Sequence, residues 1–162
     1  MSRALFAGSF DPVTMGHVDL VQRASPLFDE VLVAVADNPA KRTWFTVAER
    51  IALFEAAIEA PNVRVVRVEG LLVHAARDLG ATVLLRGLRG PADLDLELRN
   101  GLANRDQTGI ETLLLPTSPQ WSFVSSSLVK EIARYGGSVG AYLPAASHAA
   151  VLAHLERASS AS

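Results

Sequence analysis

The chain has 162 residues, of which 49% are hydrophobic, which excludes a disordered protein and predicts one domain over residues 1–162 with a core of its own. It contains no cysteine, which excludes disulfide bonds, thiolate catalysis and cysteine-ligated metal sites. The formal net charge of −2 at pH 7 gives no overall attraction for a nucleic-acid backbone, so we expect no nucleic-acid partner.

Short apolar runs alternate with helical patterns along the chain, which is typical of an α/β protein. The predicted strands span residues 3–7, 31–36, 63–68, 82–85 and 111–115. The predicted helices span residues 18–28, 46–59, 71–79, 92–103, 128–135 and 145–157, and the C-terminal helices occupy about 125–158. Five strands with crossover helices predict a doubly wound, five-stranded parallel sheet, whose ligands bind beyond the carboxyl ends of the strands.

The longest unbroken apolar run, residues 31–36, is far shorter than the ~20 residues that a membrane-spanning helix needs. The N-terminal segment reaches Asp11 before a secretory apolar region could form. We therefore expect a cytoplasmic protein with no membrane partner.

Local signals mark several helix ends. Thr46 and Glu49 have the spacing of a capping box, Gly80 suits the position after a helix end, and Pro91 suits the first turn of the next helix. Any one of the three serines at 125–127 could cap the helix that follows them.

The segment after the first strand reads Gly8-Ser9-Phe10-Asp11-Pro12-Val13-Thr14-Met15-Gly16-His17. Gly8 allows a close backbone approach or a positive φ, and Asp11-Pro12 marks a turn. A helix that starts near Gly16 directs its free amide donors at the strand end, which favours an anion, most often a phosphate. His17 would lie at that pole. It could merely cap the helix or fill a pocket, but the surrounding residues favour a functional role.

Three further loops follow strands at the same predicted edge. They carry Lys41 after the second strand, Arg86 and Arg89 after the fourth, and residues 121–127 after the fifth. One open sheet would bring these loops together. The chain has neither a GxGxxG nor a GxxxxGK[ST] motif, which argues against a dinucleotide oxidoreductase and a P-loop kinase. Ser127 and Lys130 match the SxxK pattern of penicillin-recognising enzymes, but the companion motifs are missing, so we treat the match as chance.

Three motifs together resemble those of bacterial phosphopantetheine adenylyltransferase, and the match covers nearly the whole chain. They are Gly8-Ser9-Phe10-Asp11-Pro12 with Thr14-x-Gly16-His17, then Arg86-Gly87-Leu88-Arg89, then Trp121-Ser122-Phe123-Val124-Ser125-Ser126-Ser127. The first motif is shared with the wider HxGH nucleotidyltransferase group, and the third is more selective. Thr14, where many relatives place the first histidine, also favours the pantetheine enzyme.

The resemblance implies a Rossmann-like nucleotidyltransferase fold and reversible transfer of the adenylyl group from ATP to 4′-phosphopantetheine. The products are dephospho-CoA and pyrophosphate, in coenzyme A biosynthesis. It also implies Mg²⁺ carried by phosphates and water with no metal site on the protein, feedback binding of coenzyme A, and a homohexamer. The alternatives are an adenylyl- or cytidylyltransferase for another phosphorylated acceptor, such as nicotinate mononucleotide, and a nucleotide-binding regulatory domain without turnover.

The resemblance also assigns roles to residues. His17 is the catalytic residue and stabilises the charge that builds on the α-phosphate. The acceptor is held by Ser9, Lys41 and Arg86 at its phosphate and by Leu72 along the pantetheine arm. ATP is contacted by Ser9, Phe10, His17, Gly87, Leu88, Arg89, Glu97, Trp121, Ser122, Phe123, Val124, Ser125, Ser126 and Ser127. Two unit charges about 4 Å apart repel by ~1 kcal/mol in water and ~4 kcal/mol at an effective dielectric of 20, so fixed cations would offset the repulsion between the reactants.

Each assignment has a structural alternative. Lys41 could belong to a solvated loop, and Arg89 could pair with Asp93 on the surface. Glu97 could lie on an exposed helix face. The hydrophobic candidates could belong to the core or cover the sheet edge; they are Leu72, Trp121 and Phe123.

One segment departs from the family pattern. Relatives usually have Asp-Phe-Glu-Tyr-Glu where this chain has Asp93-Leu94-Asp95-Leu96-Glu97. Leucines keep the apolar character but cannot stack or offer a phenol, which bears on the pantetheine side of the pocket. The polar stretch 99–104, with Gly101 inside it, bears on helix geometry and subunit contacts.

Overall fold

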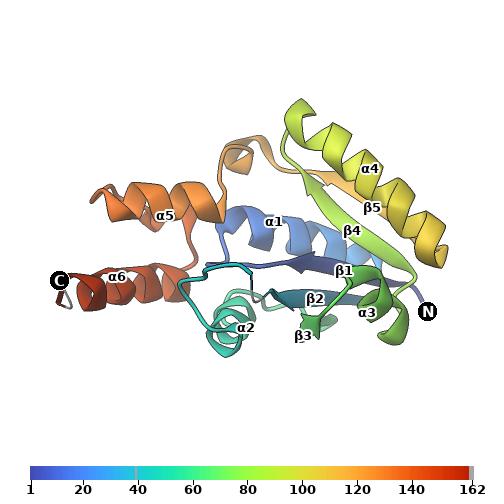
Figure 1. Cartoon of the computed structure of the whole chain (residues 1–162), viewed down its shortest axis with the longest axis horizontal. Helices are drawn as coiled ribbons and strands as arrows, with labels where there is room; N and C mark the ends of the chain where they lie inside the picture. The colour runs from blue at the N-terminus through green and yellow to red at the C-terminus, as the bar shows by residue number, and fades with distance from the viewer. Residues whose placement is uncertain (39, 161–162) are drawn as a thin grey trace.

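Five parallel strands form one sheet with the order β3-β2-β1-β4-β5 in the computed structural model, which describes residues 1–38 and 40–160 (Figure 1). The strands are β1 (Arg3–Gly8), β2 (Glu30–Asp37), β3 (Val63–Glu69), β4 (Val83–Leu88) and β5 (Glu111–Pro116). The central strand β1 pairs with β2 on one side and β4 on the other. The chain therefore winds outward in both directions from β1, and the carboxyl ends of β1 and β4 flank the switch point where open α/β sheets bind ligands. The predicted fold class is confirmed.

Helices connect the strands and follow the sheet. They are α1 (Met15–Ala24), α2 (Val47–Glu55), α3 (Leu72–Asp78), α4 (Pro91–Thr108), α5 (Ser126–Arg134) and α6 (Ala145–Ser160), with 3₁₀ turns at Ser25–Leu27, Pro119–Trp121 and Gly140–Tyr142. The last two helices, α5 and α6, extend beyond the sheet at the left of Figure 1. Within residues 1–38 and 40–160, no helix combines the length and the apolar character that crossing a membrane would require.

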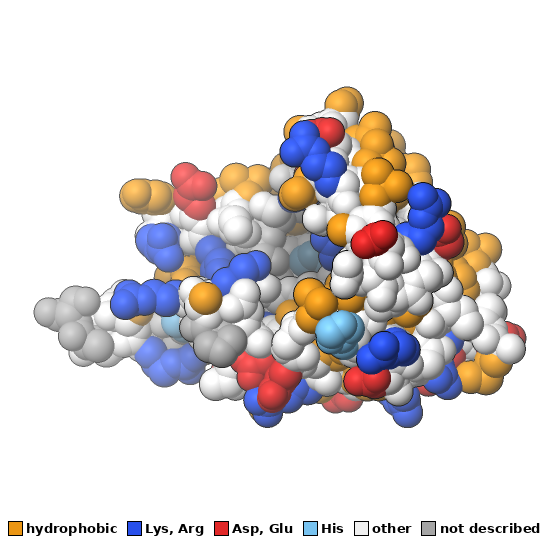
Figure 2. Space-filling view, turned by 45° about the vertical axis from the view of Figure 1, so that its right-hand side comes forward, with side chains coloured by type: hydrophobic (Ala, Val, Ile, Leu, Met, Phe, Trp, Pro, Cys, Tyr) orange, Lys and Arg blue, Asp and Glu red, His pale blue; other side chains and the backbone are white. Residues whose placement is uncertain are grey.

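Helix α4 presents an apolar side to its surroundings. Leu94, Leu98 and Leu102 are four residues apart, so they lie along one side of the helix, and all three are exposed. Leu113 of the neighbouring strand β5 is exposed as well. Figure 2 shows hydrophobic side chains gathered along the upper edge of the molecule, where α4 lies.

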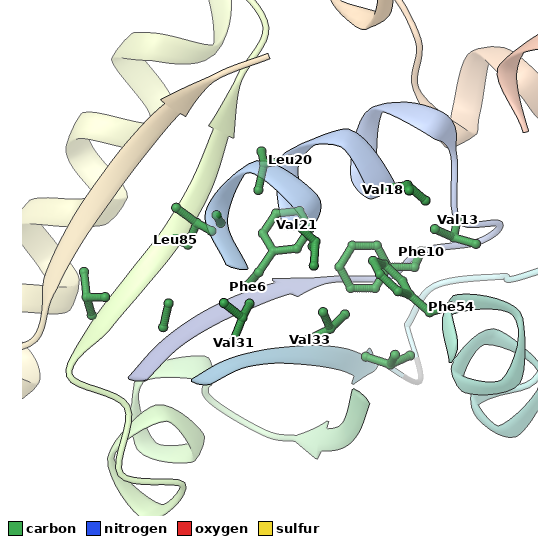
Figure 3. Packing of buried hydrophobic residues seen from close by; sticks show 14 residues of the cluster. Phe6, Phe10, Val13, Val18, Leu20, Val21, Val31, Val33, Phe54 and Leu85 are labelled. Atoms are coloured by element: carbon green, nitrogen blue, oxygen red, sulfur yellow. The ribbon is translucent and has the colours of Figure 1, made fainter. Parts of the chain in front are cut away.

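The two faces of the sheet bury two separate hydrophobic clusters, because alternate residues of a strand point to opposite faces. One face packs against α1 and α2, and its members from β1 and β2 include Phe6, Val31 and Val33 (Figure 3). The other face packs against α3, and Leu5 and Leu32 belong to it. Both faces of the central strands are therefore covered, which explains why these strands read as nearly continuous apolar runs.

A third cluster joins α5 and α6 to the loop between β2 and α2. Phe45 from that loop is buried with Val129 of α5 and Val151 of α6, and Trp44 packs against this cluster. The helices beyond the sheet are thus anchored on the segment that follows β2.

The four local signals for helix ends are confirmed. Thr46 and Glu49 form a capping box at the start of α2, and Gly80 has φ +67° directly after α3 and its C-cap. Pro91 opens α4. Among the three candidate serines, Ser125 is the N-cap of α5, and its hydroxyl accepts the N–H of Leu128. Short-range chemistry therefore places these helix ends correctly.

Several predicted boundaries are wrong, among them the end of α1, which lies at Ala24 rather than at 28. The fourth strand does not end at residue 85, because Arg86, Gly87 and Leu88 continue its pairing with β5. Helix α1 starts at Met15 rather than at 18, since Thr14 is its N-cap. Helix α2 ends at Glu55 rather than 59.

Helix α4 is longer than predicted and continues through Gly101 to Thr108. A Cβ atom at Gly101 would lie 3.3 Å from Cβ of Thr112 on β5. The missing side chain therefore allows a close contact between the helix and the sheet, and the glycine does not interrupt the helix.

Candidate active site

A cavity of about 390 Å³ opens at the carboxyl ends of β1 and β4. In Figure 2 a hollow lies near the centre of the visible face, with basic and histidine side chains inside it. Loops after four strands contribute to the lining. The predicted site residues that line it are Ser9, Phe10, His17, Lys41, Arg86, Gly87, Arg89, Glu97, Val124, Ser125 and Ser126. The predicted convergence of distant loops is therefore confirmed, with an imidazole and three basic side chains around one cavity.

The imidazole of His17 is held in one tautomer. The backbone N–H of Thr14 donates to Nδ1 of His17 over 3.0 Å, and Oγ1 of Thr14 lies 3.1 Å from the same nitrogen. Since Nδ1 accepts a hydrogen bond, the proton of the neutral ring is on Nε2. Burial, and secondarily the positive charge of Arg89, lower the pKa of His17 from 6.5 to about 4. His17 is therefore a neutral hydrogen-bond donor at physiological pH.

Phe10 supports the His17 ring from the turn after β1. Its φ is +47°, a left-handed conformation that is uncommon for a bulky residue and that clusters at functional sites. Its ring packs edge-on against His17 at a centroid distance of 5.0 Å and against Phe54 at 4.8 Å. A Cβ atom at Gly8 would lie 2.9 Å from the Phe10 ring, so the predicted close approach at Gly8 is confirmed.

Arg86 is fixed by a bidentate ion pair. Its Nε and Nη2 donate to the carboxylate of Glu97 over 2.9 and 2.8 Å, and its Nη1 donates to the Ala7 carbonyl oxygen over 2.9 Å. Glu97 is buried, so it does not lie on an exposed helix face. Arg86 is thus held at the switch point between β1 and β4, and a bidentate carboxylate contact fixes the plane of the guanidinium group.

Arg89, which follows β4, makes a similar contact with Asp93, one helical turn before Glu97 on α4. Its Nε and Nη2 donate to Asp93 over 2.9 and 3.1 Å, and this pairing lowers the pKa of Asp93 below its usual value. The ion pair between Arg89 and Asp93, which was the alternative to a phosphate-binding role for Arg89, is therefore present. Both side chains nevertheless line the cavity. Asp93 and Glu97 are four residues apart on α4, so this helix holds both arginines.

Lys41 and two serines at the start of α5 also line the cavity. Lys41 is exposed and lies in the loop after β2. The hydroxyl of Ser126 donates to the Pro12 carbonyl oxygen over 2.8 Å, which ties the start of α5 to the turn after β1. The first amide groups of a helix carry a partial positive charge, so this end of α5 suits a phosphate.

Six predicted residues do not line the cavity. Leu72 is half-buried against the core cluster around α3, which agrees with the alternative that it belongs to the core. Trp121 packs against the cluster of α5 and α6, and Phe123 is exposed with its ring against Tyr142. The other three are Leu88, Ser122 and Ser127.

Several residues at or beside the cavity were not predicted from the sequence. Leu20 and Thr117 line the cavity, and Leu20 forms an apolar part of its wall. Leu96, whose segment was expected to bear on the pocket, lines it as well. Arg50 is buried and donates to the Ser9 carbonyl oxygen over 2.6 Å and to the carbonyl oxygens of residues 36 and 45. Arg50 is the one arginine of α2, and no local sequence pattern marks it as a buried residue.

Within the described part of the chain, no group of three or more histidine, aspartate or glutamate side chains could hold a metal ion. The two carboxylates that line the cavity, Asp93 and Glu97, are each paired with an arginine.

The family described as cytidylyltransferase-like matches residues 5–132 of the chain. One similar solved structure is a protein provisionally described as a nicotinate-nucleotide adenylyltransferase from Vibrio parahaemolyticus, with a TM-score of 0.63 and 17% identity over 97% of this chain and 96% of that one. Another is the lipopolysaccharide core biosynthesis protein of Thermoplasma volcanium GSS1, with a TM-score of 0.53 and 22% identity over 73% of this chain and 97% of that one. At these identities the likeness to the two structures establishes the fold.

Proposed function

The chain belongs to the cytidylyltransferase-like family, and from this premise we propose that it transfers the adenylyl group of ATP to 4′-phosphopantetheine, forming dephospho-CoA and pyrophosphate. The main support is the placement of His17, Lys41 and Arg86 around one cavity at the switch point of the sheet. Two phosphorylated reactants need such a set of cations and donors, because their charges oppose the encounter.

In the proposed reaction, a phosphate oxygen of the acceptor attacks the α-phosphorus of ATP. The bond between that phosphorus and the oxygen bridging to the β-phosphate breaks, and its electron pair leaves with pyrophosphate. Neutral His17 donates from Nε2 to an α-phosphate oxygen, whose charge grows in the transition state. Lys41 and Arg86 hold the acceptor phosphate. No covalent enzyme intermediate is needed, so catalysis consists of positioning and charge stabilisation.

The nucleotide would lie between the turn after β1 and the start of α5. Ser9 and Phe10 would contact the triphosphate region, with Ser125 and Ser126 at the N-terminus of α5. Arg89 would meet the nucleotide phosphates once they compete with Asp93 for its guanidinium group.

The cavity suits Mg²⁺ only as a phosphate-bound ion, since its two carboxylates are occupied by arginines. Mg²⁺ would be held by the triphosphate oxygens and water, and it would neutralise part of the triphosphate charge. We also propose, from the resemblance alone, a homohexamer and feedback binding of coenzyme A. The exposed leucines of α4 support self-association, because a large apolar surface commonly marks an interaction site.

A panel of acceptors tests the proposal. The purified chain is incubated with Mg-ATP and either 4′-phosphopantetheine, nicotinate mononucleotide or no acceptor, and pyrophosphate release is followed. We expect release with 4′-phosphopantetheine, together with dephospho-CoA. Pyrophosphate release with nicotinate mononucleotide alone would show that this compound, and not 4′-phosphopantetheine, is the acceptor. The similar structure from Vibrio parahaemolyticus is itself provisionally described as a nicotinate-nucleotide adenylyltransferase. ATP binding without pyrophosphate from any acceptor would indicate a regulatory domain.

A further inference from the structure

We propose that an ion pair between Lys130 and Asp11 positions the loop that carries Lys41, and that Lys130 is therefore a positioning residue for the phosphorylated acceptor. This inference rests on the proposed function for its kinetic consequences. It starts from a buried charge network that lies beside the cavity and that the reaction itself does not use.

Asp11 has all its acceptor positions engaged. Its side chain is almost fully buried, and Nζ of Lys130 donates to Oδ2 over 2.6 Å. The backbone N–H of Trp44 lies 3.0 Å from both carboxylate oxygens, and the N–H of Phe45 donates to Oδ1 over 3.0 Å. A buried carboxylate is tolerated only when its charge is paired and its oxygens accept hydrogen bonds, and here both conditions are met. We call these contacts of Asp11 with Lys130, Trp44 and Phe45 the Asp11 tether.

The tether fixes one end of the loop that holds Lys41. Trp44 and Phe45 follow Lys41 by three and four residues, so their anchored amide groups restrict where its backbone can lie. Arg50 holds the same segment from the other side by donating to the carbonyl oxygens of Ala36 and Phe45. The loop is therefore clamped both before and after Lys41, while the Lys41 side chain stays exposed at the cavity.

The tether also joins this loop to α5. Lys130 belongs to α5. Its Nζ forms the ion pair with Asp11 and lies 5.9 Å from the centroid of the Trp44 ring. The same helix carries Ser125 and Ser126 at its start. Lys130 thus connects the helix proposed to bind the nucleotide phosphates with the loop proposed to bind the acceptor phosphate.

The role of Lys130 can be separated from simple packing against Trp44. Arg134 lies one turn further along α5 and is also over the Trp44 ring, at 5.6 Å from the centroid. Among the described residues, the hydrogen-bond partners of Asp11 are Lys130 and the amides of Trp44 and Phe45, and Arg134 is not one of them. Lys130→Met and Arg134→Met therefore each remove one cation from the Trp44 ring, but only the first removes the counter-charge of Asp11.

The first measurement uses amide hydrogen exchange of the full chain without substrate. In Lys130→Met, the amides of Trp44 and Phe45 should exchange roughly tenfold faster than in the wild type, because their acceptor has lost its fixed position. Arg134→Met should leave both rates unchanged, and Lys130→Arg should restore protection. If Lys130→Met does not fold, Asp11→Asn/Lys130→Met removes both charges and serves in its place. Equal exchange in Lys130→Met and Arg134→Met would overturn the tether.

The second measurement is steady-state kinetics with Mg-ATP and 4′-phosphopantetheine. Lys130→Met should raise KM for 4′-phosphopantetheine roughly tenfold, with kcat and KM for ATP within about twofold of the wild type. Because Lys130 acts through the Lys41 loop, adding Lys130→Met to Lys41→Ala should raise KM little further. Additive increases, or a loss of kcat alone, would contradict a positioning role. If the wild type releases no pyrophosphate, the proposed function fails, and the exchange result alone still supports or overturns the tether.

Discussion

The neighbours of His17 set the tautomer and the pKa that its proposed role requires. Burial and the charge of Arg89 lower its pKa to about 4, and the Thr14 amide occupies Nδ1. The unfolded chain takes up the proton near pH 6.5, well before the folded chain does. Between pH 6.5 and about 4 the unfolded state therefore binds more protons, and the free energy of unfolding falls as the pH is lowered through this window.

This pKa is directly measurable. We expect ¹⁵N NMR of the free protein to show His17 neutral at pH 6, protonated on Nε2 and not on Nδ1, with the resonances assigned by comparison with His17→Ala. The proton on Nδ1 should appear only as the pH approaches 4. A titration midpoint near 6.5 would show that burial and Arg89 do not lower the pKa of His17. A neutral ring protonated on Nδ1 would show that the Thr14 contact does not set the tautomer.

Glu97 is the second residue with a sharp prediction. Glu97→Gln removes the negative partner of the half-buried Arg86, so it should lower the free energy of unfolding by about 1–3 kcal/mol. Asp95→Asn on the same helix breaks the pair with Arg99, in which both side chains are exposed, and should have a smaller effect. Urea unfolding of the two variants provides the comparison. Equal losses would mean that burial of the Glu97 pair contributes nothing.

At the scale of elements, the turn between β1 and α1 is packed so tightly that one methyl group is too large. In Gly8→Ala the new Cβ would lie 2.9 Å from the ring of Phe10. That ring cannot move away easily, because it is enclosed by Phe6, His17 and Phe54. We expect a loss of about 1–3 kcal/mol in the free energy of unfolding, measured by urea denaturation.

Gly16→Ala is the matched control for this turn. Its Cβ would meet no atom closer than 3.5 Å, which is an ordinary contact. The variant should therefore unfold within about 0.5 kcal/mol of the wild type. If Gly8→Ala proved as stable as Gly16→Ala, the Phe10 ring would have to be mobile and could not support His17.

The elements also show what a sequence can reveal. Local signals mark where helices begin. The capping box of Thr46 and Glu49 is one of them, and it predicted the start of α2 correctly. The extension of β4 through Arg86 was not predicted, because it depends on pairing with Leu114, which lies far along the chain. The buried partners of the loops were missed for the same reason: Asp11 and Lys130 are 119 positions apart. Motifs thus located the cavity, whereas the contacts that fix its loops required the fold.

At the scale of the whole molecule, the leucine side of α4 is the surface that we expect to mediate assembly. Leu98→Glu places a charge between Leu94 and Leu102 on the exposed side of α4, and should convert an assembled wild type to smaller species. Sedimentation velocity measures this directly. Leu152→Glu on α6, where the leucine is also exposed, is the control and should leave the assembly intact. A monomeric wild type would contradict the proposed hexamer.

At the scale of the whole cavity, the proposed reaction depends on one histidine, His17, to stabilise the charge that develops in the transition state. The decisive measurement is single-turnover release of pyrophosphate from Mg-ATP and 4′-phosphopantetheine by the wild type and by His17→Ala, with ATP affinity determined by calorimetry. Loss of one donor to a developing charge should slow release by roughly 10²–10³-fold, while ATP binding and the fold are retained. Equal rates for the two proteins would contradict the placement of the chemistry at His17.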